Sequence, residues 1–365
     1  MKKKKILIFG LTSLIGGIET YIINLTRNID LEKFEIYFLA QDDIIGINKE
    51  KIEGCFKKIY KVENFKRHPI KAMKTLKEIY VKEKFDIVHL NLSTASSALY
   101  ALPCKKHSKM TKIISHSHAA GNKNEFQHIL FKHILNKISD KYLACSYAAG
   151  KWMFGKKIAN SSKMIITNNA IETEKFIFNE GIREKIRKEL NIAKDEFVIG
   201  HVGRFNEVKN HMGMLEILQP ILSKKRNIKL VLLGKGELED TVKRKVKELG
   251  IDSQVLFLGA KSNVHEYYQI MDVFVLPSKF EGLPIVGIEA QASGLKCIFS
   301  NNVTKEVDIT GNAIFISLED KEKWRSTILE IQENGYIREN EKDKIEKNKY
   351  DLKKEVSKIE KIYLN

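Results

Sequence analysis

Short apolar runs alternate with longer amphipathic segments along this chain, and the alternation occurs in two successive blocks. A short apolar run bounded by turn residues is typical of a buried strand, and apolar residues spaced three and four apart predict a helix. Strands that alternate with helices favour a parallel sheet with right-handed crossovers. The sequence therefore predicts an α/β protein of two doubly wound domains, each binding ligands at the carboxyl ends of its strands.

The first block occupies about half of the chain, and a charged helical stretch, Gly181–Leu190, precedes the second. The last 45 or so residues are expected to form charged helix. In the first block we predict strands at Lys5–Phe9, Phe34–Leu39, Asp86–Leu90, Lys112–Ser115, Lys141–Cys145 and Met164–Thr167, and helices at Ile18–Arg27, Pro69–Lys82 and His128–Lys137. In the second we predict strands at Phe197–Val202, Lys229–Leu233, Gln254–Leu258 and Val273–Leu276, and helices at His211–Leu222 and Glu237–Leu249.

The length of 365 residues exceeds what one ordinary core accommodates. We expect a first domain over residues 1–185 and a second over residues 186–345. Residues 346–365 are expected to form a separate charged helix. A solvated tail is the alternative for this last segment.

The net charge of +17 is concentrated in the first domain. Residues 1–185 carry 33 basic and 18 acidic side chains, a net charge of +15, which leaves +2 for the rest of the chain. A basic face attracts anionic lipid or nucleic acid, although a solvated lysine-rich surface would have the same composition. Because no nucleic-acid-binding motif is present, we expect an anionic membrane surface as partner and no nucleic acid.

The scattered cysteines and the weak match to a signal peptide favour a cytosolic protein, and its basic first domain is expected to lie peripherally at the inner face of the cell membrane. No apolar run approaches the ~20 residues of a membrane span. Lys2–Lys5 precede an apolar stretch as in a signal peptide, but several polar residues and glycines interrupt that stretch, which favours a first strand. The four cysteines form no CxxC pair, so we expect reduced thiols and no metal site. They are Cys55, Cys104, Cys145 and Cys297.

Two glutamates with seven residues between them stand in the segment Phe280–Ala290. Glu281 lies in the loop after a predicted strand, and Glu289 lies in a short helix that Pro284 can open. A strand, a tight loop and a helix N-terminus form a ready anion site. Two acceptors beside an anion site suit a ligand with both hydroxyls and phosphates, such as a nucleotide sugar.

Two cations stand at the corresponding end of the first strand of the second block. Arg204 follows that strand, and Lys209 precedes the next helix, so both are expected near a strand end where they can neutralise a diphosphate. Glycines at three strand ends, Gly203, Gly234 and Gly259, can lie along a nucleotide. Solvated cations and ordinary turns are the alternative for these residues.

In the first block, the turn that contains Gly16 and Gly17 lets backbone approach a ligand at the start of a helix. His116 and His118 follow the strand Lys112–Ser115, where a histidine can orient a substrate or transfer a proton. Because side chains alternate in an extended segment, we expect at most one of the two to face the ligand. A pair of surface histidines is the alternative.

With these elements in order, the chain resembles retaining glycosyltransferases of family 4, which have the GT-B fold of two Rossmann-like domains facing a central cleft. The resemblance covers essentially the whole chain and is closest to bacterial capsule and exopolysaccharide enzymes. Its most specific part joins the two-glutamate segment to the upstream cations. The other matching elements are Gly16–Glu19, Phe85–His89, His116–His118, Asn169–Glu172, Gly203–Phe205, Leu233–Gly236 and Asp272–Leu283.

The resemblance implies a role for each matching residue. Glu281 would bind donor-sugar hydroxyls, the backbone of Gly282 and Leu283 would approach the sugar and phosphates, and Glu289 would bind the ribose. Arg204 and Lys209 would stabilise the departing diphosphate, with no metal and no cofactor. Gly203, Gly234 and Gly259 would lie along the donor, and Gly16 and Gly17 would pass close to the phosphates or the acceptor. His118, with His116 as its alternative, would be the catalytic histidine that faces the cleft. The resemblance also implies that the helix of residues 346–365 crosses back to the first domain.

The implied activity is metal-independent transfer of a hexose-type sugar, with retention, from a nucleoside diphosphate sugar to a lipid-linked or oligosaccharide acceptor. A UDP-sugar is expected in preference to a GDP-sugar. The departures from the family pattern are small: Asn169-Ala170 replaces the usual Asn-Gly, and no Asp-x-Asp metal signature occurs at a strand end. Two alternatives are a sugar-nucleotide epimerase of the same fold and a non-catalytic nucleotide-sugar-binding subunit. The sequence contains no additional carboxylates of the kind an epimerase would need.

Overall fold

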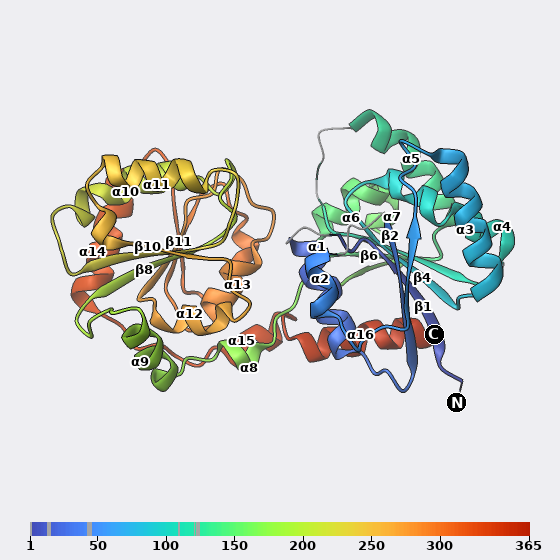
Figure 1. The fold of residues 1–365 in the computed structure, drawn as a ribbon. Coiled ribbons are helices and arrows are strands. Elements are labelled where there is room, and N and C mark those ends of the chain that lie inside the picture. The colour runs from blue at the N-terminus through green and yellow to red at the C-terminus, as the bar shows by residue number, and fades with distance from the viewer. Residues whose placement is uncertain (1, 13–15, 42–45, 109, 120, 122–124) are drawn as a thin grey trace. The chain divides into compact units, whose positions relative to one another are not determined.

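The computed structural model describes residues 2–12, 16–41, 46–108, 110–119, 121 and 125–365 (Figure 1). The chain divides into two compact units. Unit 1 comprises residues up to Ala170 together with Leu352–Asn365, and unit 2 comprises Ile171–Asp351. The sequence analysis placed this division after residue 185, because the charged helix Gly181–Leu190 carries no signal that assigns it to one domain. In the structure that helix is part of unit 2.

Unit 1 is built on a seven-stranded parallel sheet in the order β3-β2-β1-β4-β5-β6-β7. The strands are β1 (Lys4–Phe9), β2 (Phe34–Gln41), β3 (Lys58–Val62), β4 (Ile87–Leu92), β5 (Lys112–Ser117), β6 (Lys141–Ala144) and β7 (Met164–Ile166). The helices are α1 (Gly17–Asn28), α2 (Gly46–Lys51), α3 (Pro69–Glu83), η1 (Ala95–Tyr100), α4 (Leu102–His107), α5 (Glu125–Ile138), α6 (Tyr147–Phe154), α7 (Lys156–Ala159) and the C-terminal α16 (Leu352–Leu364).

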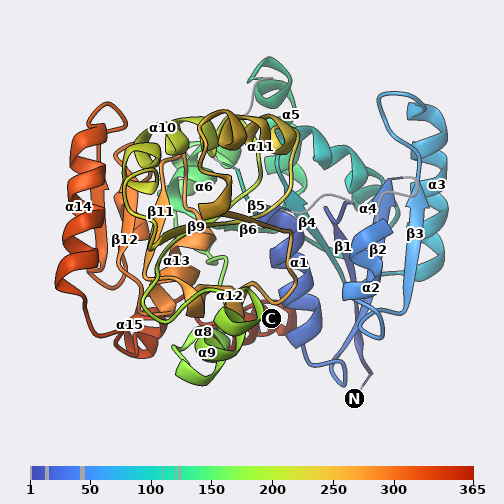
Figure 2. The ribbon, with the colours of Figure 1, turned by 60° about the vertical axis from the view of Figure 1, so that its left-hand side comes forward.

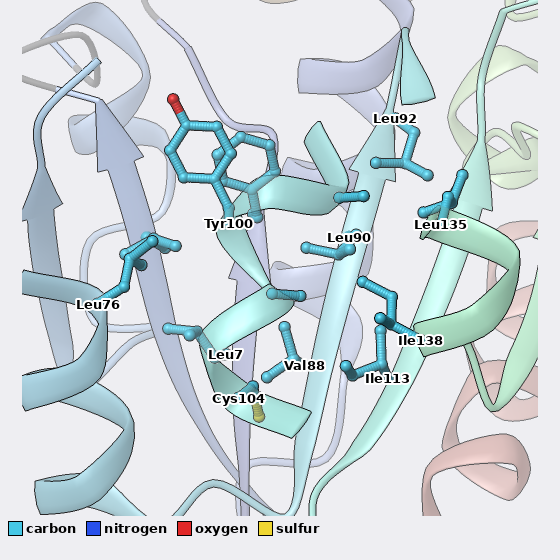
Figure 3. Close-up of a cluster of buried hydrophobic side chains, with 14 of the residues drawn as sticks. Leu7, Leu76, Val88, Leu90, Leu92, Tyr100, Cys104, Ile113, Leu135 and Ile138 are labelled. Carbon is cyan, nitrogen blue, oxygen red and sulfur yellow. The ribbon is translucent and has the colours of Figure 1, made fainter. Parts of the chain in front are cut away.

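Alternation along the strands gives unit 1 two cores, one on each face of the sheet. Leu7 packs among α3, η1, α4 and α5, as Figure 3 shows. Its neighbours Ile6 and Ile8 point to the opposite face, where α1 and α16 cover the sheet. Tyr363 of α16 is fully buried there, so this helix is an integral part of unit 1 although about 180 residues of unit 2 precede it.

Unit 2 repeats the architecture with six parallel strands in the order β10-β9-β8-β11-β12-β13 (Figure 2). The strands are β8 (Phe197–Val202), β9 (Ile228–Leu233), β10 (Val255–Gly259), β11 (Val273–Leu276), β12 (Cys297–Ser300) and β13 (Ala313–Ile316). The helices are α8 (Thr173–Phe176), α9 (Glu180–Glu189), α10 (His211–Leu222), α11 (Glu239–Glu248), η2 (Asp252–Gln254), α12 (Val264–Ile270), α13 (Ile285–Ala292), η3 (Lys305–Val307), α14 (Lys321–Asn334) and α15 (Lys342–Lys347).

The predicted α/β class with two doubly wound parallel sheets is confirmed. Three short strands, β3, β12 and β13, are absent from the sequence prediction. Two of them lie at sheet edges and the third has four residues, so none carries a long apolar run. The prediction of continuous charged helix over the last 45 residues is wrong in part, because Gly335, with φ of 59°, ends α14 and the chain forms two further helices. Among the described residues, no helix is both long and apolar enough to span a bilayer.

Candidate active site

Strands β8 and β11 are neighbours in the centre of the unit 2 sheet, and the chain leaves them in opposite directions. From β8 the sheet continues through β9 and β10, and from β11 through β12 and β13. In doubly wound sheets, ligands bind at the carboxyl ends of the strands where the order reverses in this way. The loops of residues 203–210 and 277–284 start from these two ends, and they contain most of the predicted donor-site residues.

Two hydrogen bonds fix these loops to each other. The amide N–H of Lys279 donates to the Val208 carbonyl over 2.8 Å, and Nδ2 of Asn210 donates to the Pro277 carbonyl over 3.0 Å. Asn210 has φ of 57°, in the left-handed region that asparagine tolerates better than most residues. The loops therefore form one preorganised surface.

The two loops bring Lys209 and Glu281 together. Nζ of Lys209 lies 2.6 Å from Oε1 of Glu281, and both side chains are 16% exposed. Oγ of Ser278 donates to the same carboxylate oxygen over 3.1 Å. The backbone of Glu281 forms an isolated β-bridge with Val303, which follows β12. This bridge fixes the backbone from which the carboxylate extends. Lys209 and Glu281 therefore lie side by side at the carboxyl ends of β8 and β11.

Glu289 lies in α13, which begins at Ile285 with Pro284 at its N-cap. Burial raises the pKa of Glu289 to about 7, although a hydrogen bond from Tyr268 and the nearby charge of Lys209 act to lower it. The Tyr268 hydroxyl lies 2.8 Å from Oε2 of Glu289 and 3.2 Å from the Val286 carbonyl. The sequence analysis missed Tyr268, because a buried tyrosine in a helix carries no signal that distinguishes it from a core residue.

Arg204 has a different environment. Its Nη2 lies 3.4 Å from Oε2 of Glu237, and both side chains are more than half exposed. Arg204 thus points into solvent with a surface partner, whereas Lys209 is held against Glu281. An exposed ion pair of this kind contributes about 0–1 kcal/mol, so Arg204 is free to exchange its partner for an anion.

The glycines at the strand ends lie where the backbones of neighbouring strands approach each other closely. The N–H of Gly203 donates to the Leu233 carbonyl, and the N–H of Gly234 donates to the Gly259 carbonyl, each over 2.9 Å. Gly234 has φ of 141°, and a Cβ atom there would lie 2.0 Å from the Gly203 carbonyl oxygen. Gly282 is exposed with nothing within 4 Å of an added Cβ.

Two buried histidines, His201 and His211, lie beneath Lys209. Nδ1–H of His201 donates to the Val275 carbonyl over 2.9 Å, and the His211 ring stacks on Phe205 with centroids 4.1 Å apart. Burial, followed by the nearby charge of Lys209, lowers the pKa of His211 to about 4. Both rings are therefore neutral near pH 7, and they add no charge that would compete with Lys209 for an anion.

In unit 1 the chain order also reverses between neighbouring strands, β1 and β4. His118 follows β5, next to β4, and its Nε2 lies 2.9 Å from Oδ1 of Asn91. The Asn91 amide donates to the Phe9 carbonyl over 3.1 Å, which orients Oδ1 toward the histidine. Burial lowers the pKa of His118 to about 3, so the ring is neutral.

His116 lies within β5, which extends two residues further than predicted. Its Nδ1 lies 3.3 Å from His89 and its Nε2 lies 2.8 Å from Oγ1 of Thr167, and His89 in turn contacts the Tyr363 hydroxyl over 2.6 Å. The alternation argument used to separate His116 from His118 is wrong, because residues two apart in an extended segment share a face, and their ring centroids are 4.0 Å apart. That at most one of the two faces the ligand stays a prediction.

Gly16 is the N-cap of α1 and Gly17 its first residue. A Cβ atom on Gly16 would lie 2.9 Å from Oε2 of Glu19, whose other oxygen accepts from Thr12 over 2.5 Å. Residues 13–15 of this turn lie outside the described part of the chain. Among the described residues, no group of three or more His, Cys, Asp or Glu side chains could hold a metal ion.

Both halves of the chain match known protein families. Residues 15–175 match the family described as Glycosyltransferase Family 4, and residues 182–351 match the family described as Glycosyl transferases group 1. The chain is 31% identical over 302 residues to the putative glycosyltransferase EpsF of Bacillus subtilis, covering 80% of this chain and 78% of that protein.

Two further similarities extend over most of the chain. The UDP-Gal:alpha-D-GlcNAc-diphosphoundecaprenol alpha-1,3-galactosyltransferase of Escherichia coli is 28% identical over 322 residues, 81% of this chain and 80% of that protein. The crystal structure of HepE of Anabaena in complex with UDP and glucose superposes with a TM-score of 0.73 at 14% identity, covering 97% of this chain and 95% of that one. The latter similarity establishes the fold, which is of the GT-B class.

Proposed function

The chain belongs to glycosyltransferase family 4, and from this premise we propose that it transfers a sugar from a nucleoside diphosphate sugar to a lipid-linked acceptor during assembly of a bacterial polysaccharide. The observation that carries the proposal is the pairing of Lys209 with Glu281 at the carboxyl ends of β8 and β11. The pair supplies a cation for a diphosphate and an acceptor for sugar hydroxyls in one preorganised place. Membership of the family disfavours both the epimerase and the non-catalytic subunit as alternatives.

In the proposed reaction, the bond between the anomeric carbon and the diphosphate oxygen breaks, and an acceptor hydroxyl forms the new bond on the same face of the sugar. The hydroxyl proton passes to the departing diphosphate. Lys209 and Arg204 stabilise the charge that develops on the diphosphate, with no metal required. Glu281 and the backbone of Gly282 and Leu283 position the sugar.

The remaining predicted residues take supporting roles. Glu289 accepts hydrogen bonds from the ribose hydroxyls, and Gly203, Gly234 and Gly259 keep the strand ends open to the nucleotide. In unit 1, His118 with Gly16 and Gly17 orients the acceptor. We assign this role to His118 because both ring nitrogens of His116 contact buried side chains.

Two considerations support the choice of substrates. The Escherichia coli relative is named for a UDP-sugar donor and a diphosphoundecaprenol acceptor, and the HepE structure contains UDP. We therefore propose a UDP-sugar rather than a GDP-sugar. The net charge of +15 on residues 1–185 supports action at an anionic membrane surface, which for a lipid carrier bearing a diphosphate is the inner face of the cell membrane.

Transfer is tested by incubating the protein with a panel of UDP- and GDP-sugars, with and without an undecaprenyl-diphosphate-linked sugar. We expect release of nucleoside diphosphate that depends on the acceptor, and a product that retains the donor's anomeric configuration by NMR. Thermal stabilisation by one donor without any acceptor-dependent release would instead identify a binding subunit. A product of inverted configuration would contradict the retaining mechanism.

Donor binding is expected to tighten as pH rises through about 7, the pKa of Glu289. The ionised carboxylate accepts from both ribose hydroxyls, whereas the protonated form, which dominates at lower pH, has lost one acceptor. Below about pH 7 the Kd for an intact UDP-sugar should rise by up to about tenfold per pH unit. Calorimetric titration between about pH 6 and 8 measures this slope.

Two variants test the assignment of this slope to Glu289. Glu289→Gln should bind more weakly and show no pH dependence in this range. Tyr268→Phe removes the hydrogen bond that lowers the pKa of Glu289, so the midpoint should move to higher pH. A slope that persists unchanged in Glu289→Gln would assign the titration to another group.

A further inference from the structure

Helix α3 presents apolar side chains to solvent on the side that faces away from the core of unit 1. Ile70 is 87% exposed, Val81 is 50% exposed and Met73 is 37% exposed. The opposite side of the helix is packed into the core through residues such as Leu76, which is fully buried. The helix lies at the edge of unit 1, where it contacts β3 and α4 (Figure 2). Ile70, Met73 and Val81 are exposed to solvent in the described part of the chain.

The exposed apolar residues form one stripe. Positions 70, 73, 74, 77 and 81 are three or four residues apart, so they lie on the same side of an α-helix. Lys74 and Lys77 therefore stand between the apolar side chains. A shallow groove runs along the helix, and it is lined by Lys74, Lys77, Glu78, Val81 and Lys82, three basic side chains against one acidic. A lysine in this position can lie along the apolar surface with its methylene stem and extend its ammonium group outward.

The segment is also strongly basic. Residues 66–84 contain seven basic and two acidic side chains, for a net charge of +5. Of the two acidic residues, Glu83 is mostly buried and paired with Lys5 over 3.2 Å, and Glu78 is exposed in the groove. Within the described part of the chain, neither Lys74 nor Lys77 has an acidic side chain within 4 Å. Their charge is thus available to an external anion.

We propose that this face of α3 docks on an anionic lipid bilayer, with the helix lying in the plane of the interface. Ile70, Met73 and Val81 insert between the head groups, and the lysines bind lipid phosphates. A polar face rich in lysine next to protruding apolar side chains is typical of interfacial helices. Protein interfaces are instead depleted in lysine, which makes an acidic protein the poorer occupant.

This inference gives the proposed membrane association a particular surface, and its test does not require the proposed reaction. Vesicles of phosphatidylglycerol and of phosphatidylcholine are sedimented with the full chain at low and high salt. We expect binding to phosphatidylglycerol vesicles only, released as salt rises. Ile70→Asp/Val81→Asp should reduce this binding about tenfold or more, and Lys74→Glu/Lys77→Glu should reduce both the binding and its salt dependence.

The matched control reverses two positive charges in unit 2, the same change in net charge as in Lys74→Glu/Lys77→Glu. Arg244 and Lys247 are exposed on α11, and Arg244→Glu/Lys247→Glu should bind vesicles as the wild type does. All variants should keep the wild-type melting temperature, because the substituted side chains point away from the core. If Ile70→Asp/Val81→Asp has a lower melting temperature than the wild type, Ile70→Ser/Val81→Ser is used in its place. It should also bind vesicles more weakly than the wild type.

Vesicle binding by Ile70→Asp/Val81→Asp that equals the wild type would overturn the proposal, as would an equal loss of binding in the α11 control. Soluble polyglutamate tests for an acidic protein partner. If Ile70→Asp/Val81→Asp weakens binding to polyglutamate as much as it weakens binding to vesicles, an acidic protein would be indicated instead. Transfer to a soluble acceptor is expected to be unchanged in the α3 variants. Loss of transfer with vesicle binding intact would count against the proposed function and leave the docking surface standing.

Discussion

Replacement of Lys209 by alanine is expected to lower kcat for sugar transfer by about 100- to 1,000-fold, with a much smaller change in KM for the donor. The ammonium group stabilises charge that develops only as the diphosphate departs, so its loss acts mainly on the transition state. The variant should remain folded, because the Lys209 side chain lies at an accessible edge and makes its principal contact with Glu281. Rates of nucleoside diphosphate release under saturating donor and acceptor measure the effect.

Lys279 provides the matched control for this variant. It stands in the loop next to Glu281, but its Nζ pairs over 2.9 Å with Glu207 and both side chains are more than half exposed. Lys279→Ala should keep kcat within about twofold of the wild type, because an exposed pair contributes little. Equal losses in the two variants would show that positive charge in this region acts generally, and would remove the specific role of Lys209.

Substitution of Glu281 complements the test of Lys209, because the two side chains are in contact. The Glu281 carboxylate contacts Lys209 and accepts a hydrogen bond from Ser278. When the diphosphate of the nucleotide sugar binds the Lys209 ammonium group, the Glu281 carboxylate needs another hydrogen-bond partner. The hydroxyl groups of the sugar can donate hydrogen bonds to it. Glu281→Gln therefore should lose most of the transfer activity, and the loss in the double variant with Lys209→Ala should be smaller than the product of the two single losses.

The second large effect is expected on stability. Gly234→Ala should lower the free energy of unfolding of unit 2 by about 3 kcal/mol, because the new Cβ atom adds backbone strain and a contact with the backbone of β8. At φ of 141° a side chain is strained, and the Cβ atom would lie 2.0 Å from the Gly203 carbonyl oxygen, which cannot move without displacing the end of β8. For a unit of this size the melting temperature should fall by about 6–12 °C.

Two other glycines separate the contribution of backbone strain from that of the steric contact. Gly250 has φ of 65° and open space around an added Cβ, so Gly250→Ala reports strain alone and should cost about 1 kcal/mol. Gly282 has neither positive φ nor a neighbour within 4 Å, so Gly282→Ala should leave the melting temperature unchanged. A melting temperature for Gly234→Ala within 2 °C or so of the wild type would mean that the ends of β8 and β9 yield more easily than the geometry indicates.

Much of the fold could be predicted because the signals are local. Strand β11 was predicted with its bounds, and helix α3 to within one residue, from apolar runs and periodicity alone. Strand β13 has only four residues and lies at a sheet edge. Its existence depends on pairing with β12, which is a long-range contact that no local pattern records.

The candidate site was predictable in its residue types and only partly in its geometry. The positions of Lys209 and Glu281 at strand ends follow from sequence, but they are 72 residues apart and their 2.6 Å contact depends on β8 and β11 being neighbours. His116 in β5 and His118, which follows β5, show the reverse case. Their spacing of two residues already predicts one shared face, because alternation separates only adjacent residues.

By itself, the sequence determined most of the strands and helices, where the chain carries excess positive charge, and which residue types stand at the strand ends. These properties depend on side chains close together in the chain. The tertiary structure alone decided that the short strands β12 and β13 form, that Glu289 is buried beside Tyr268 with a pKa of about 7, and that Arg204 faces solvent while Lys209 is paired with Glu281. Each of these depends on desolvation or contact between distant segments, and both exist only once the sheets have assembled.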